Sequence, residues 1–293
     1  MAKYSTANPN DVISALRKRN LYSSKRDNGN VVVIGGSKIY HGAPALASNA
    51  AYSVLAALRT GAGYARAFVP KDVAAAVRCV SPDVIVEPLK GSRLSSSDSA
   101  RLSMAIDHAD SLIIGNGLGR NAQSLKASCK LIGHAIRMSK GVVVDADAIY
   151  AAMKCSKGLS GDLVMTPNDR EFSLFSKKEL DPKDVESRAS AAMRLSARLN
   201  CIILLKGHLT IITNGKKCKV VSPKSSALAV MGTGDVLAGI IGGLLAINHD
   251  AFASAVAGAC IHAAAGDYLY KRMGNHILAS DVVGCIPNIL KGF

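Results

Sequence analysis

Four consecutive residues, Gly232-Thr233-Gly234-Asp235, combine a small-residue loop with a carboxylate and lead into an apolar run at 236–247. Glycine lets a backbone approach a ligand closely, and the first N–H groups of a helix lack intrahelical partners. A helix starting here would therefore bind an anion such as a phosphoryl group. Asp235 would repel that anion unless it accepts a proton from an attacking hydroxyl. Helix capping explains the same carboxylate equally well.

Further polar residues follow predicted strands. Asp145 ends one strand, and Asn168 and Glu171 follow the next. Magnesium at nucleotide phosphates is held through one or two carboxylates and several waters, so this sparse acidic set suits phosphoryl chemistry, with Asn168 and Glu171 as metal-site residues acting through water. Their spacing is also that of an asparagine cap and a glutamate in a capping box. Lys206, at the exit of another strand, can orient a nucleotide phosphate.

Common nucleotide-binding signatures are absent from the sequence. It contains no G-x-x-x-x-G-K-[ST] sequence, which excludes a P-loop NTPase. The glycines of Gly115-Asn116-Gly117-Leu118-Gly119 follow a strand, but Arg120 stands where a dinucleotide-binding fingerprint needs its third glycine. Ser37 lies outside any G-x-S-x-G context, and His262 reads as a satisfied core residue within an apolar helix.

Short apolar runs alternate with helical segments along the chain. This alternation predicts an α/β fold with a doubly wound, mostly parallel sheet, helices on both faces and a ligand site beyond the carboxyl ends of the strands. Asn214-Gly215 supplies a tight turn, so we expect an antiparallel hairpin at the sheet edge. The expected strands are 31–34, 64–69, 84–86, 112–114, 142–144, 163–165, 202–205, 210–213 and 217–221, and the expected helices include 10–21, 43–59, 73–80 and 183–199.

We expect a single domain over residues 1–293, with an N-terminal helix and polar loop in 1–30. The Ser-rich segment 93–102 has few apolar residues, which predicts a surface loop that leads into a helix near residue 108. No apolar segment reaches the roughly 20 residues that a membrane span needs.

The net charge of +15 invites a nucleic-acid interpretation. However, the basic residues are dispersed, aromatic residues make up 4% of the chain, and tryptophan is absent. Stacking platforms for single strands are therefore scarce, and a small anionic ligand suits the charge better. A basic, non-enzymatic nucleotide or RNA binder remains the alternative from a different functional class.

The seven cysteines are odd in number, scattered and never in a C-x-x-C arrangement. This pattern predicts free, buried thiols in a reducing compartment, and with no visible signal peptide we expect a cytoplasmic protein.

Taken together, several stretches resemble the ADP- or ATP-dependent NAD(P)H-hydrate dehydratases, which have a ribokinase-like fold. The resemblance extends in order from about residue 25 to 290. The G-A-P and L-R-x-G-A-G regions are the more specific ones. The similar segments are Gly35-Gly36-Ser37 with Tyr40, Gly42-Ala43-Pro44, Leu58-Arg59-Thr60-Gly61-Ala62-Gly63, Ile114-Gly115-Asn116-Gly117-Leu118-Gly119, Val144-Asp145-Ala146-Asp147, Thr166-Pro167-Asn168, Leu205-Lys206-Gly207, Gly232-Thr233-Gly234-Asp235, His262-Ala263-Ala264-Ala265-Gly266-Asp267 and Ala279-Ser280-Asp281.

The resemblance implies repair of hydrated NADH or NADPH, with Mg²⁺ as cofactor and ADP or ATP as co-substrate. It makes Asp235 the catalytic base, and the N–H groups of Gly232, Thr233 and Gly234 stabilise the phosphoryl group in flight. We also expect a homo-oligomer, and any epimerase activity must come from a separate chain. The implied contacts are Ala43, Gly117, Gly119, Asn168 and Asp235 for the substrate, and Lys206, Gly207, His208, Leu209, Thr210 and Gly234 for the nucleotide.

The sequence departs from the family pattern at three places. The family usually carries proline at Asn116 and histidine at Asn168, and a glycine-rich stretch where 225–231 stands. Thr166-Pro167-Asn168 followed by Glu171 is instead common in ribokinase-like small-molecule kinases. A kinase of the hydroxymethylpyrimidine, thiazole or sugar type is therefore the closest alternative function.

Overall fold

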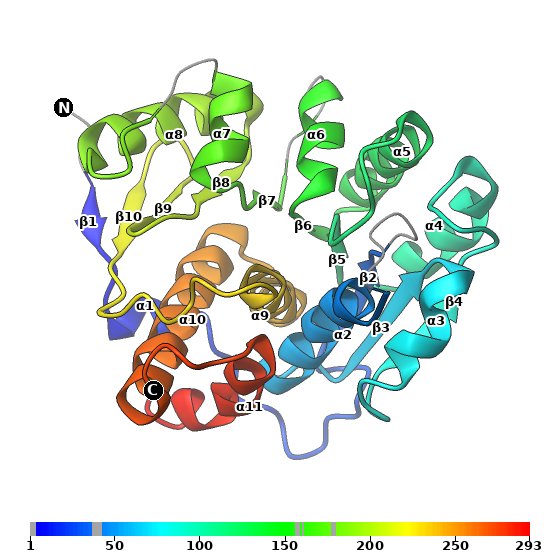
Figure 1. Ribbon diagram of the computed structural model, residues 1–293, viewed down its shortest axis with the longest axis horizontal. Coiled ribbons are helices and arrows are strands. Elements are labelled where there is room, and N and C mark those ends of the chain that lie inside the picture. Colours follow the sequence, from blue (N-terminus) through cyan, green and yellow to red (C-terminus); the bar gives the residue numbers. More distant parts are fainter. Residues whose placement is uncertain (1–3, 37–42, 156–158, 160, 177–179) are drawn as a thin grey trace.

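The computed structural model describes residues 4–36, 43–155, 159, 161–176 and 180–293 (Figure 1). Within these residues the chain builds one ten-stranded sheet with helices on both faces. The strands are β1 (Ser5–Thr6), β2 (Asn30–Ile34), β3 (Tyr64–Val69), β4 (Ile85–Pro88), β5 (Ser111–Ile114), β6 (Gly141–Val144), β7 (Leu163–Met165), β8 (Ile202–Leu205), β9 (Thr210–Thr213) and β10 (Cys218–Val221).

The spatial order of the strands is β1-β10-β9-β8-β7-β6-β5-β2-β3-β4. All neighbours pair in parallel except β8 with β9 and β9 with β10. From β2 the chain first runs outward to β3 and β4, then returns to place β5 on the other side of β2. In such sheets the ligand site lies at this switch point, outside the carboxyl ends of the strands.

Two groups of helices cover the two faces. α2 (Ala43–Thr60), α3 (Lys71–Arg78), α9 (Thr233–Asn248) and α10 (Ala251–Met273) pack on one face, with α11 (Ala279–Leu290) outside them. α4 (Ser99–Asp107), α5 (Ala122–Arg137), α6 (Asp147–Lys154), α7 (Asp169–Ser176) and α8 (Val185–Leu199) belong to the other. Alternate residues of β2 enter the two cores: Val31 and Val33 one, Val32 and Ile34 the other.

The most deeply enclosed helix is α9, which is buried at almost every position. Its glycines allow neighbours to approach closely. A Cβ at Gly239 would lie 2.5 Å from the backbone oxygen of Ser53 on α2, and one at Gly242 would lie 2.5 Å from the Ile113 side chain on β5. Any larger residue would force these elements apart, so α9 is fixed relative to the sheet.

Three local expectations prove wrong. The N-terminal helix, α1 (Pro9–Ile13), ends well before residue 21, and a short strand, β1, precedes it. The segment 93–102 contains a 3₁₀ turn and the start of α4, and Leu94 and Leu102 are fully buried in the core. Although that segment has few apolar residues, it places them where they cover the sheet. The helix expected near residue 108 ends at Asp107.

The cysteine prediction also needs correction. Cys129 on α5 and Cys155 at the end of α6 form a disulfide, with their Cα atoms 6.1 Å apart. The remaining five are free thiols as expected, but Cys79 is exposed and Cys260 half-buried. Sequence spacing missed the pair because the two helices meet only in the folded chain.

Across the described ranges, no helix combines the length and apolar character needed to cross a bilayer.

Candidate active site

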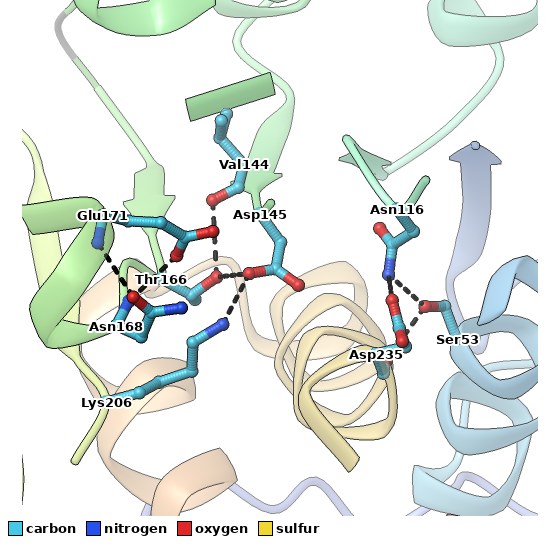
Figure 2. Close-up of polar contacts among 9 residues, drawn as sticks. All are labelled: Ser53, Asn116, Val144, Asp145, Thr166, Asn168, Glu171, Lys206 and Asp235. Atoms are coloured by element: carbon cyan, nitrogen blue, oxygen red, sulfur yellow. Dashed lines mark hydrogen bonds and ion pairs between the residues drawn. The ribbon is translucent and has the colours of Figure 1, made fainter. Parts of the chain in front are cut away.

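Loops at the carboxyl ends of β5, β6, β7 and β8 meet the start of α9 (Figure 2). The predicted residues Asp145, Asn168, Lys206 and Asp235 therefore lie along one edge of the sheet, at its switch point. Gly115 permits this convergence, because a Cβ there would overlap the backbone oxygen of Asp145.

Asp235 lies in the first turn of α9 and is 9% exposed. Gly232, with a φ of 92°, is the N-cap, so the helix begins without a side-chain cap. The Asp235 carboxylate instead accepts a hydrogen bond through Oδ1 from the Asn116 side-chain amide. Of the two interpretations of this residue, the geometry disfavours the cap and leaves a buried carboxylate beside a helix N-terminus.

The surroundings of Asp235 raise its pKa to about 7. Burial is the main cause, and the negative charge of Asp145 adds to it; the Asn116 hydrogen bond and the positive charge of Lys206 act in the opposite direction. A carboxylate whose pKa lies near neutrality can both take up and release a proton at working pH, which suits a general base.

Lys206, at the end of β8, forms the second part of the site. Its Nζ lies 2.8 Å from Asp145 Oδ1, which also accepts a hydrogen bond from Thr166 Oγ1 at 2.7 Å. Burial alone would lower the pKa of Lys206, but the charges of Asp145 and Glu171 outweigh it and raise that pKa. The ammonium is thus a stable positive charge, and an added Cβ at Gly234 would lie only 3.6 Å from it.

Asn168 and Glu171 form the capping box at the start of α7. Glu171 N donates to Asn168 Oδ1 at 2.8 Å, and Asn168 N donates to Glu171 Oε2 at 3.0 Å. Burial, and to a smaller extent Asp145, raise the pKa of Glu171, although Lys206 lowers it. The described residues contain no cluster of three metal-ligating side chains. The capping-box interpretation of Asn168 and Glu171 is thus confirmed, and their role in a metal site stays a prediction.

A cavity of about 770 Å³ opens beside Lys206. Of the predicted nucleotide contacts, Lys206, Gly207, His208, Thr210 and Gly234 line it, together with Asn168 and Thr233. Leu209 is the exception, since it packs against the core. The opposite wall is largely apolar and comes from Leu228, Ala229, Val230, Leu237, Ala259 and Ala263.

His262 also lines this cavity. Its Nε2 is buried and finds no hydrogen-bond partner in the part of the chain that the structure describes, so the expected satisfied core residue is not what is found. Burial lowers its pKa to about 4, and the imidazole is therefore neutral at physiological pH.

In the Gly232–Gly234 loop, the backbone N–H group of Thr233 already has an acceptor. Thr233 N donates to Val230 O at 3.4 Å, and Thr233 Oγ1 donates to Leu228 O at 2.8 Å. These bonds fold the preceding segment back under the loop.

Two of the predicted substrate residues, Gly117 and Gly119, lie in the loop that follows β5. Gly117 has a φ of 67°, and Gly119 N donates to Asp147 Oδ2 at 2.9 Å, so both belong to a fixed loop beside Asn116. Ala43 is the first residue of α2, but its side-chain surroundings are not described. Ser37, Tyr40 and Gly42 lie outside the described residues.

Residues 31–288 match the model of a protein family described as NAD(P)H-hydrate dehydratase. The chain belongs to this family. A relative from Cenarchaeum symbiosum, named ADP-dependent (S)-NAD(P)H-hydrate dehydratase, is 37% identical over 290 residues, covering 97% of this chain and 96% of its own length.

Solved structures confirm the ribokinase-like fold of this dehydratase-family chain. A ribokinase-like superfamily protein from Enterococcus faecalis superposes with a TM-score of 0.83 at 23% identity, covering 99% of this chain and 96% of the other. The ADP/ATP-dependent NAD(P)H-hydrate dehydratase from Bacillus subtilis, co-crystallised with ATP and Mg²⁺, gives 0.78 at 23% identity, covering 100% and 99%. The chain spans about half the length of the bifunctional NAD(P)H-hydrate repair enzymes that it also matches.

Sequence reasoning overlooked a residue of this dehydratase-family chain that supports the site. Arg188, on α8, is fully buried and pairs with Asp169, with Nη2 2.9 Å from Oδ1. The Arg188 Nη1 atom donates a hydrogen bond to Leu209 O at 2.8 Å. The guanidinium also packs so closely against Gly207 that a Cβ at that position would overlap Nη2. Arg188 therefore holds the 206–209 loop from beneath. No sequence signal marks this role, because Arg188 is one of several basic residues in a charged helix.

Proposed function

We propose that this chain removes water from hydrated NADH or NADPH in a reaction that consumes ADP or ATP. The observation that carries the proposal is Asp235, a buried carboxylate with a pKa of about 7 next to a helix N-terminus and the Lys206 cavity. Family membership and the name of the 37% identical relative support the same substrate class.

The chemistry follows from the leaving group. The oxygen of the ring hydroxyl attacks the terminal phosphorus of the nucleotide while Asp235 accepts the hydroxyl proton. The nucleotide, shortened by one phosphate, is the leaving group. The hydroxyl thereby becomes a phosphate ester. The ring nitrogen's electron pair then expels inorganic phosphate, and loss of a ring proton restores the dihydropyridine double bond. The net products are NAD(P)H, phosphate and the shortened nucleotide.

The proposed division of labour assigns the 770 Å³ cavity to the nucleotide. Its apolar wall suits an adenine ring, and Lys206 with the start of α9 provides positive potential for the phosphates. The backbone N–H groups of Gly232 and Gly234 stabilise the transferring phosphoryl group, a contribution of about 3 kcal/mol for each preorganised donor. The N–H group of Thr233 already donates to Val230 O. The substrate then lies on the Gly117 side of Asp235.

A magnesium ion is part of the proposal. Asn168 lines the cavity, and Glu171 keeps a second carboxylate oxygen besides the one that accepts from Asn168 N, so the pair fits a site that holds the ion through water. When bound, magnesium neutralises phosphate charge. The Bacillus subtilis neighbour was crystallised with ATP and Mg²⁺, which supports this assignment.

The test is a product assay with hydrated NADH, hydrated NADPH, magnesium and either ADP or ATP. We expect the absorbance of the reduced nicotinamide to return in step with phosphate release. No recovery with either nucleotide would sink the proposal. Phosphorylation of a hydroxymethylpyrimidine, thiazole or sugar without elimination would instead favour the kinase alternative suggested by Thr166-Pro167-Asn168 and Glu171.

The remaining expectations belong to this proposal. A single domain over residues 1–293, a homo-oligomer, a cytoplasmic location and a separate epimerase fit a repair enzyme that acts on dissolved cofactors. Equilibrium sedimentation of the purified chain tests the oligomeric state directly.

A further inference from the structure

Asn116 occupies an unusual position for a polar side chain. It lies two residues beyond the end of β5, at the switch point of the sheet, and has no solvent exposure. Its backbone oxygen accepts a hydrogen bond from Gly36 N at 2.7 Å, and positive φ angles at Gly115 and Gly117 flank it. Because the backbone is fixed on both sides, the direction of the Asn116 side chain is set by the fold.

That side chain closes a ring of hydrogen bonds with Asp235 and Ser53 (Figure 2). The two amide hydrogens of Asn116 serve Asp235 Oδ1 and Ser53 Oγ, the latter at 3.1 Å. Ser53 Oγ in turn donates to the backbone oxygen of Asp235 at 2.9 Å. Ser53 is fully buried on α2, where Gly239 of α9 lets the two helices touch.

We propose that Asn116, braced by Ser53, is a positioning residue that holds the Asp235 carboxylate by Oδ1 and directs Oδ2 toward the hydroxyl that loses its proton. This inference rests on the proposed function, in which Asp235 is the base. A free aspartate side chain can rotate about two torsions, so a base without this contact spends time away from the reacting hydroxyl. Misplacement of a reacting group by about 1 Å can cost on the order of 100-fold in rate.

The contact also has an electrostatic effect. Burial and the charge of Asp145 raise the pKa of Asp235, whereas Lys206 and a backbone hydrogen bond of Asp235 itself lower it. Donation from Asn116 stabilises the charged form and lowers that pKa.

The test compares Asn116→Leu, which keeps the size but removes the donor, with Ser53→Ala, which removes only the brace. For Asn116→Leu we expect kcat to fall by about 10- to 100-fold on the high-pH plateau, and the acid limb of the pH profile to move to higher pH. Ser53→Ala should show the same changes in weaker form. Nucleotide Kd should stay within about twofold, because neither residue lines the nucleotide cavity.

Ser111→Ala is the matched control. Ser111 lies on β5, the strand that precedes Asn116, and is as fully buried as Asn116 and Ser53. Its Oγ donates to the backbone oxygen of Gly242 on α9, the helix that carries Asp235, at 2.8 Å. It should cost stability without moving the acid limb. If Asn116→Leu keeps the wild-type limb and plateau, or if Ser111→Ala moves the limb equally, a positioning role is refuted.

A second readout separates this inference from the proposed function. The ¹³C-carboxyl resonance of Asp235, assigned by its loss in Asp235→Asn, reports the titration of this group without any turnover. We expect a higher pKa in Asn116→Leu than in wild type. A wild-type enzyme that is inactive on hydrated NAD(P)H would overturn the function but leave this comparison valid; an unchanged titration would overturn the role of Asn116 alone.

Discussion

Asp145 and Asp235 are two buried carboxylates at one edge of one sheet, but they have opposite partners. Asp145 is 3% exposed and meets the Lys206 ammonium at 2.8 Å. Asp235 is 9% exposed and meets the neutral amide of Asn116. The Asp145 carboxylate directly contacts an opposite charge, whereas the Asp235 carboxylate directly contacts the dipole of an amide.

The difference shows how one fold separates two roles for the same side chain. The Asp145 carboxylate holds the Lys206 ammonium in place beside the cavity. A carboxylate held by an amide in a buried position keeps a pKa near 7 and can exchange a proton. Both carboxylates are buried, so the two residues differ mainly in the group that each carboxylate contacts.

The largest expected effect comes from removing the base. Asp235→Asn keeps the size and the Asn116 contact but cannot accept a proton, so turnover should fall about 10²- to 10⁴-fold. Binding of ADP or ATP, measured by calorimetry, should remain. Turnover within threefold of wild type would refute the assignment of Asp235 as base.

The second prediction concerns the support under the Lys206 loop. Arg188→Met leaves Asp169 and the backbone oxygens of Lys206 and Leu209 without their buried partner. The free energy of unfolding should therefore fall by about 3–5 kcal/mol. Nucleotide affinity should weaken too, because the 206–209 loop loses its anchor. Urea denaturation measures the first effect and calorimetry the second.

Arg194→Met is the control for this variant, because Arg194 is exposed on the same helix. It should change the unfolding free energy by no more than about 0.5 kcal/mol. Equal losses in the two variants would contradict the anchoring role of Arg188.

The third prediction is that the raised pKa of Asp235 makes the free energy of unfolding depend on pH. The folded-state pKa of about 7 exceeds the usual value near 4, so the folded state favours the protonated form. Its contribution to stability is complete at low pH and is lost as the pH rises through 7. Asp235→Asn should therefore be more stable than wild type at pH 8, by up to a few kcal/mol, in thermal or urea unfolding. Equal or lower stability of the variant at pH 8 would contradict the raised pKa.

The smallest effect is the interaction between the two carboxylates themselves. Asp145 raises the pKa of Asp235, so Asp145→Asn should move the acid limb of kcat/KM to lower pH. Asp147→Asn, whose carboxylate instead contacts Arg120 and Gly119 N, should leave the position of the limb unchanged. A shift to higher pH in Asp145→Asn would show that loss of its bond to Lys206 dominates.

The sequence predicted the fold class and most strands, because fully buried parallel strands read as short apolar runs ended by glycine. Five of the six residues that the resemblance assigns to the nucleotide line the cavity, whereas anion binding by the Gly232–Gly234 loop stays a prediction. The sequence could not find the ring of Asn116, Ser53 and Asp235, since these residues lie far apart in the chain and only the switch point brings them together. Arg188 and the disulfide escaped for the same reason: their partners are close only in space.

The enclosure of α9 has a consequence for motion. A helix wedged against α2 and β5 through its glycines cannot tilt, so its amides should exchange hydrogen for deuterium among the slowest in the protein. Asp235 thus sits on the stationary part of the molecule. The reactants must therefore be brought to a base that stays still.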